Sequence, residues 1–81
     1  MAGRKRKTTR RGLYVRRVLA RNVRRLRLAR KMNQEVLADA AYLSQSQVSL
    51  IESAQINIRI DVLQRLASAL GARLADLLAD S

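Results

Sequence analysis

Apolar residues recur at helical spacing in five stretches of the chain, and residues that start or stop helices bound these stretches. The stretches span about residues 13–31, 33–41, 45–53, 61–71 and 74–79. Residues 54–60 alternate between apolar and polar as a strand does, but no second strand is available to pair with them. We therefore interpret them as a loop, and the whole pattern predicts an all-α, compact five-helix domain.

Polar residues at the predicted helix starts can satisfy the backbone N–H groups that are free there. Asn33 is a good N-cap for the second helix. Ser44 is followed three residues later by Gln47, which is the spacing of a capping box at the third helix. Asp61 and Gln64 have the same spacing, and they predict a capping box at the start of the fourth helix.

The third predicted helix has an unusual outward face. Val48 and Ile51 mark its buried side, because a helix turns by about 100° per residue. The opposite side carries small or uncharged side chains: Gln45, Ser46, Ser49, Leu50 and Ser53. Such a face would let the helix lie deep in a DNA major groove, where glutamine pairs with adenine and apolar groups contact the thymine methyl. An ordinary solvated face would carry more lysine and glutamate.

Charge is distributed unevenly along the 81 residues, whose net charge is +11. Residues 1–31 contain 14 of the 17 basic residues and none of the six acidic ones. Residues 1–12 are expected to form a flexible basic arm ahead of a helical domain over residues 13–81. This asymmetry indicates a polyanionic partner, with nucleic acid as the first candidate and an anionic membrane surface as the second.

Composition also limits the chemistry that the chain can perform. It contains no cysteine and no histidine, so neither a disulfide nor a Cys/His zinc site can form. The acidic residues are scattered, and no glycine-rich phosphate loop occurs. No 18-residue apolar run is present, so no segment is expected to span a membrane. We expect a non-enzymatic cytoplasmic protein, associated with a bacterial or phage nucleoid, that needs no cofactor or metal.

The second helix, a three-residue turn and the third helix match the spacing of a helix-turn-helix. Four segments of this region (residues 23–27, 33–38, 44–52 and 57–71) match in sequence. On these segments, residues 22–78 resemble the lambda-repressor-like helix-turn-helix family, which is also called the Cro/C1 or XRE family. The resemblance implies that the third helix is the recognition helix.

The family's roles can be transferred position by position. Base edges would be read by Gln45, Ser46, Ser49 and Leu50. Gln34 would bind a phosphate and brace the recognition helix. Further phosphate contacts are expected from Gln47, Gln55, Asn57 and Arg59, and from the arm residues Arg4, Lys5, Arg6, Lys7, Arg10 and Arg11. Arg27 and Glu52 match an inward-facing ion pair between the first and third helices.

Lys31, Tyr42 and Ala54 stand where the family often has glycine. A left-handed backbone there would cost a residue with a side chain roughly 1 kcal/mol or more. Tyr42 either bends the turn between the second and third helices differently or places its ring against the DNA backbone. We therefore expect any departure from the family in the shapes of the connections rather than in the fold.

The resemblance implies a sequence-specific transcription regulator that binds double-stranded DNA as a homodimer at an inverted repeat. Small phage repressors and restriction-modification controller proteins are similar in kind. Dimer contacts are expected from Leu74, Leu77 and Leu78, unless these leucines only close the core of one chain. RNA polymerase would be a further partner of an activator. The alternative is an antitoxin or antiactivator that masks a protein partner and binds DNA secondarily.

Overall fold

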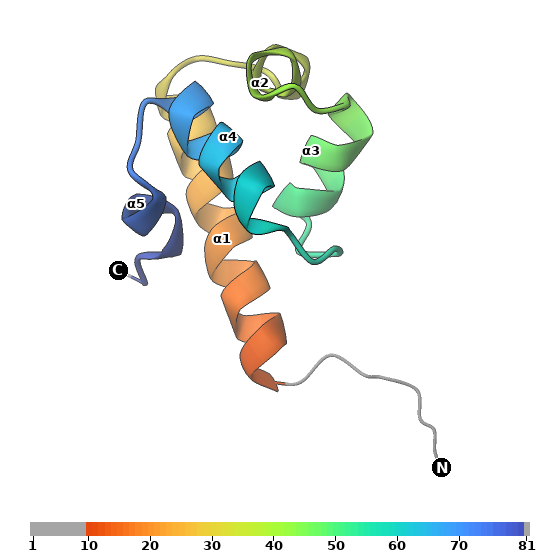
Figure 1. Ribbon diagram of the computed structural model, residues 1–81, viewed down its shortest axis with the longest axis vertical. Coiled ribbons are helices and arrows are strands. Elements are labelled where there is room, and N and C mark those ends of the chain that lie inside the picture. Colours follow the sequence, from red (N-terminus) through yellow and green to blue (C-terminus); the bar gives the residue numbers. More distant parts are fainter. Residues whose placement is uncertain (1–9, 81) are drawn as a thin grey trace.

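The computed structural model describes residues 10–80, and within this range the chain forms five α-helices and no strand (Figure 1). The predicted all-α fold is confirmed. The helices are α1 (Arg10–Ala29), α2 (Gln34–Ala41), α3 (Gln45–Glu52), α4 (Ile60–Leu70) and α5 (Leu74–Leu78). α2 packs against α3 and α4, and α1 contacts both α3 and α5. No helix among the described residues is long and apolar enough to cross a bilayer.

α1 begins at Arg10, three residues earlier than the sequence predicts. Residues 10–12 therefore belong to this helix and not to the predicted arm, while residues 1–9 lie outside the described part of the chain. The first turns of α1 project beyond the other helices (Figure 1). Val15, which the sequence places on the buried stripe, is 49% exposed for this reason.

Each helix contributes at least one fully buried side chain to a single core. Val48 and Ile51 anchor α3, as predicted, and Leu37 anchors α2. Leu77 of α5 is also completely buried within the chain, which corrects its predicted place in a dimer interface. It closes the core, so it has no free surface with which to contact a second copy.

Two of the three predicted helix caps are present. The Ser44 side chain accepts a hydrogen bond from the backbone N–H of Gln47, and the Gln47 side chain accepts one from the backbone N–H of Ser44, at 3.1 and 2.9 Å. The Asn33 side chain accepts from the backbone N–H of Val36 at 2.8 Å. These bonds fix the starts of α3 and α2, and therefore the geometry of the corner between them.

The predicted capping box of Asp61 and Gln64 is wrong. α4 starts one residue earlier, at Ile60, and its N-cap is Arg59, which makes no capping hydrogen bond through its side chain. Asp61 instead lies in the first turn, where its charge complements the helix dipole, and it forms an exposed ion pair with Arg59 at 3.2 Å.

One residue with a left-handed backbone lies in each of the four connections between helices. Lys31, Tyr42 and Ala54 have φ values of 58°, 58° and 61°, and Gly71 has a φ of 63°. In each connection the next residue donates its N–H to the carbonyl five residues back: Met32 to Arg27, Leu43 to Ala38, Gln55 to Leu50 and Ala72 to Ala67. Helices α1 to α4 thus end in the same hydrogen-bonded motif. The connections keep the shape that glycine would adopt.

The C-terminal segment is held against α1 by side chains of that helix. Asn22 is buried and donates to the carbonyls of Leu77 and Ala79 at 2.9 and 2.8 Å. Arg21 donates to the carbonyl of Ala79 at 3.2 Å. Tyr14 donates its hydroxyl to the Asp80 carboxylate, and this hydrogen bond is the main reason that the pKa of Tyr14 is raised. α5 is only one turn and a half long, so the bonds from the buried Asn22 and the packing of Leu77 in the core together fix where it lies.

Candidate nucleic-acid interface

The outward face of α3 carries the four residues that the sequence assigns to base reading. Gln45, Ser46, Ser49 and Leu50 are all exposed and together line one shallow depression. Because Val48 and Ile51 are buried on the opposite side, α3 cannot rotate about its axis without losing its core packing. The depression is therefore presented in a fixed orientation, and its surface carries no charged group.

An ion pair ties α3 to α1 beneath this face. Arg27 donates from Nε to Oε2 of Glu52 at 2.6 Å and from Nη2 to Oε1 at 3.0 Å, and both side chains are nearly fully buried. The third guanidinium nitrogen, Nη1, donates to the carbonyl of Met32 at 2.8 Å. The pair is thus bidentate. Oε1 of Glu52 can still accept a hydrogen bond from one more donor, because a carboxylate oxygen has two lone pairs.

That donor is Gln34, the first residue of α2. Its side-chain Nε2 lies 3.2 Å from Oε1 of Glu52, and its Oε1 accepts from Nε2 of Gln45 at 3.5 Å. A continuous chain of polar contacts therefore leads from the buried Arg27 to Gln45 at the surface. It joins the first turn of α2 to both ends of α3, and it sets the direction of the Gln34 and Gln45 amides.

The sequence indicated that Gln34 braces α3, but it did not indicate the contact with Glu52. A signal existed, because Gln45 and Glu52 are seven residues apart and so lie on the same face of the helix two turns apart. A side chain between Gln45 and Glu52 can therefore contact both.

The described range contains no group of three or more carboxylates placed to hold a metal ion.

The residues assigned to phosphate contacts belong to several elements of the chain. Gln47 is exposed at the start of α3, and Gln55, Asn57 and Arg59 are exposed in the loop that follows it. The ion pair between Arg59 and Asp61 is open to solvent, so it competes only weakly with a phosphate for the guanidinium. Arg10 and Arg11 lie in the first turn of α1. The other arm residues, Arg4, Lys5, Arg6 and Lys7, fall outside the described residues.

The two-helix corner and its fixed, uncharged outer face define a helix-turn-helix DNA-binding domain. A family model described as helix-turn-helix matches residues 23–77. The restriction-modification controller protein C.AhdI from Aeromonas hydrophila is 31% identical with a TM-score of 0.75, over 76% of this chain and 94% of that one. The chain belongs to this family, in its XRE or Cro/C1 type, and is a DNA-binding transcription regulator.

Two further solved structures are similar. The hypothetical transcription factor NHTF from Neisseria is 33% identical with a TM-score of 0.81, over 85% of this chain and 78% of that one. The clp gene regulator ClgR from C. glutamicum is 28% identical with a TM-score of 0.74, over 79% of this chain and 83% of that one. A comparison with curated protein sequences gives no match. Residues 10–22 of α1 precede the segment that the family model covers.

Proposed function

We propose that the protein is a sequence-specific transcription regulator that binds an inverted-repeat operator as a homodimer, in the manner of a controller or repressor. The observation that carries this proposal is the depression on α3, which is exposed, uncharged and held in place by the core and by Gln34. In the complex, α3 of each subunit would lie in a major groove, with the two half-sites about 34 Å apart.

Gln45 can read adenine without giving up its contact with Gln34. An amide nitrogen carries two hydrogens, and only one of them is directed to Gln34. The second hydrogen can bind adenine N7 while the amide oxygen accepts from adenine N6. Leu50 supplies an apolar surface for a thymine methyl. Neither arginine nor lysine is available on this face for guanine, so we expect adenine or thymine at the contacted positions.

Phosphate contacts would come from two sides of the depression. Gln34 and Gln47 lie at the starts of α2 and α3, where free backbone N–H groups and the helix dipole also favour an anion. Gln55, Asn57 and Arg59 lie on the loop after α3. In the dimer, Leu78 of α5 is exposed on 44% of its surface and Leu74 is half-buried, so both are able to contact a second copy.

Binding selection on random duplexes, followed by affinity measurements on the selected site, tests the proposal. Gln45→Ala should weaken discrimination at one position by about 1–3 kcal/mol, which is roughly 5- to 150-fold. Gln64→Ala, which truncates an exposed glutamine on α4, should leave both affinity and specificity unchanged. A consensus dominated by guanine, or a Gln45→Ala variant that keeps full discrimination, would contradict the assignment.

An apolar surface that stays exposed in the homodimer would favour the alternative of an antitoxin or antiactivator. The surface that could serve is an exposed apolar groove beside α1 and α5. Protection of that groove in the purified homodimer favours the regulator alone. An apolar dye that binds the dimer as strongly as it binds the separated subunit would favour the alternative.

A further inference from the structure

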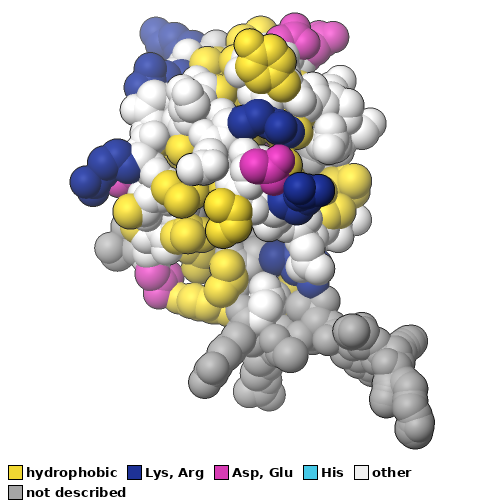
Figure 2. Space-filling view, viewed as in Figure 1, with side chains coloured by type: hydrophobic (Ala, Val, Ile, Leu, Met, Phe, Trp, Pro, Cys, Tyr) yellow, Lys and Arg dark blue, Asp and Glu magenta, His cyan; other side chains and the backbone are white. Residues whose placement is uncertain are grey.

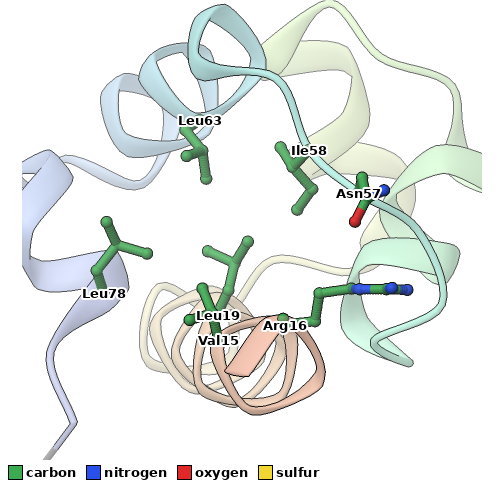
Figure 3. Close-up of a pocket in the computed structure, with 8 residues that line it drawn as sticks. Val15, Arg16, Leu19, Asn57, Ile58, Leu63 and Leu78 are labelled. Carbon is green, nitrogen blue, oxygen red and sulfur yellow. The ribbon is translucent and has the colours of Figure 1, made fainter. Parts of the chain in front are cut away.

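An open groove of about 510 Å³ lies between the first half of α1, the loop after α3, α4 and α5. Figure 3 shows Leu19, Ile58, Leu63 and Leu78 directed into the same space from these four elements. Two polar side chains, Arg16 and Asn57, also line the groove, and they lie near each other at one end of it. The remainder of the lining is apolar.

The rim of this groove also exposes apolar side chains. Val15 on α1 and Leu78 on α5 are 49% and 44% exposed. On the far side of Val15 and Leu78 a smaller apolar hollow continues the surface toward Tyr14. Figure 2 shows hydrophobic side chains gathered on this face of the molecule. A contiguous apolar surface of this kind generally marks an interface.

Residues 1–9 are unsuited to cover it. They include four basic residues, and their only apolar side chains are those of Met1 and Ala2. Burying lysine or arginine against leucine and valine without a carboxylate partner would cost more than the apolar contacts gain. Residues 1–9 therefore do not supply the occupant, which must present an apolar surface.

The geometry of an inverted repeat places a second copy of the chain on this side. Two recognition helices about 34 Å apart each lie about 17 Å from the two-fold axis between them. The groove adjoins the recognition helix, because its wall contains Asn57 and Ile58 from the loop that directly follows α3, so a second copy seated on it would bring the two α3 helices to neighbouring positions. It also combines a hollow with exposed apolar residues of its own lining, Val15 and Leu78. A two-fold interface brings the same patch of each copy together, so each copy would supply both parts.

We propose that a second copy of this chain covers the groove in the homodimer, so that residues 12–19 of α1 form a dimerisation element. This inference rests on the proposed function, and it extends the interface from α5 to α1. The contact is apolar between two subunits that each carry a net charge of +11. Added salt screens their repulsion, so dimerisation strengthens as the salt concentration rises.

Sedimentation equilibrium of the full chain with Val15→Asp, compared with Val36→Asp, tests the proposal. Val15 on α1 is 49% exposed and Val36 on α2 is 48% exposed. The same substitution is therefore made at two equally exposed valines, of which only Val15 lines the groove. Val15→Asp replaces an apolar contact by a buried carboxylate on each subunit of the dimer and should raise the dimer dissociation constant by about 100-fold. Val36→Asp should leave the constant unchanged. Circular dichroism should show the same helix content for both variants.

Failure of this inference and failure of the proposed function give different results. Wild-type protein that dimerises, together with a Val15→Asp variant that dimerises equally well, would overturn the α1 interface and leave the regulator intact. Wild-type protein that stays monomeric even on an inverted-repeat duplex would overturn both. If the inference holds, Val15→Asp still binds a single half-site with wild-type affinity, because the depression on α3 is unchanged.

Discussion

Lys31, Tyr42 and Ala54 occupy a backbone conformation that glycine adopts most easily. A residue with a side chain pays about 1–2 kcal/mol of strain in this conformation. Replacement by glycine removes the strain, but it also raises the conformational entropy of the unfolded chain, which offsets part of the gain in stability. Ala54→Gly should therefore stabilise the protein by up to about 1 kcal/mol, as measured by urea unfolding at fixed protein concentration. Ala40→Gly, inside α2, should destabilise it by about 1 kcal/mol. Destabilisation by both substitutions would refute the interpretation.

The sequence identified these three positions as departures from glycine but not their conformation. The backbone angle at each is fixed by a hydrogen bond to the carbonyl of a completed helix, such as the bond from Leu43 to Ala38 at 2.8 Å. Asn22 went unnoticed for a related reason. Its partners, Leu77 and Ala79, are 55 and 57 residues away, and no local pattern marks a side chain whose acceptors are so distant.

Among the helices, α5 depends most on contacts made by another element. It has five residues, too few to persist alone, and Asn22 on α1 binds the carbonyls at its end. Asn22→Ala should cost about 1–3 kcal/mol, because the buried Leu77 carbonyl is left without this donor, whereas the Ala79 carbonyl keeps its bond from Arg21. Hydrogen exchange should show the amides of α5 opening more often than those of α2 and α3. Tyr14→Phe, which removes an exposed hydrogen bond of the same segment, serves as the control and should change exchange little.

Helix boundaries followed the sequence where a side-chain cap sets them and departed from it at the starts of α1 and α4. Ser44 and Asn33 cap their helices as the sequence predicts. The start of α1 was misplaced because Gly12 and its arginine neighbours have the composition of a loop. In the folded chain the helix runs through Gly12 in spite of the low helix propensity of glycine, and Gly12 lines the same groove as Leu63 of α4. The apolar groove itself was not predicted, since it joins four separate elements.

At the scale of the whole molecule, charge acts in opposite directions on the two proposed associations. DNA binding releases counterions and weakens with salt, whereas association of two cationic subunits strengthens with salt. Residues 32–81, which contain α3 and most of the core, have a net charge of −3, so the basic excess resides in residues 1–31. Attraction to DNA therefore comes mainly from the part of the chain that does not read bases.

Removing residues 1–9 separates general attraction from specificity. The deletion removes Arg4, Lys5, Arg6 and Lys7 and leaves α1 whole. If these residues bind phosphates, the slope of log affinity against log salt should fall by roughly 0.9 for each phosphate that is no longer neutralised, or by up to about 3.6 per subunit. Affinity should drop equally on the operator and on an unrelated duplex, because phosphate binding carries no sequence information. Replacing the same four residues with glutamine controls for chain length. An unchanged salt slope in both variants would mean that the basic segment does not contact DNA.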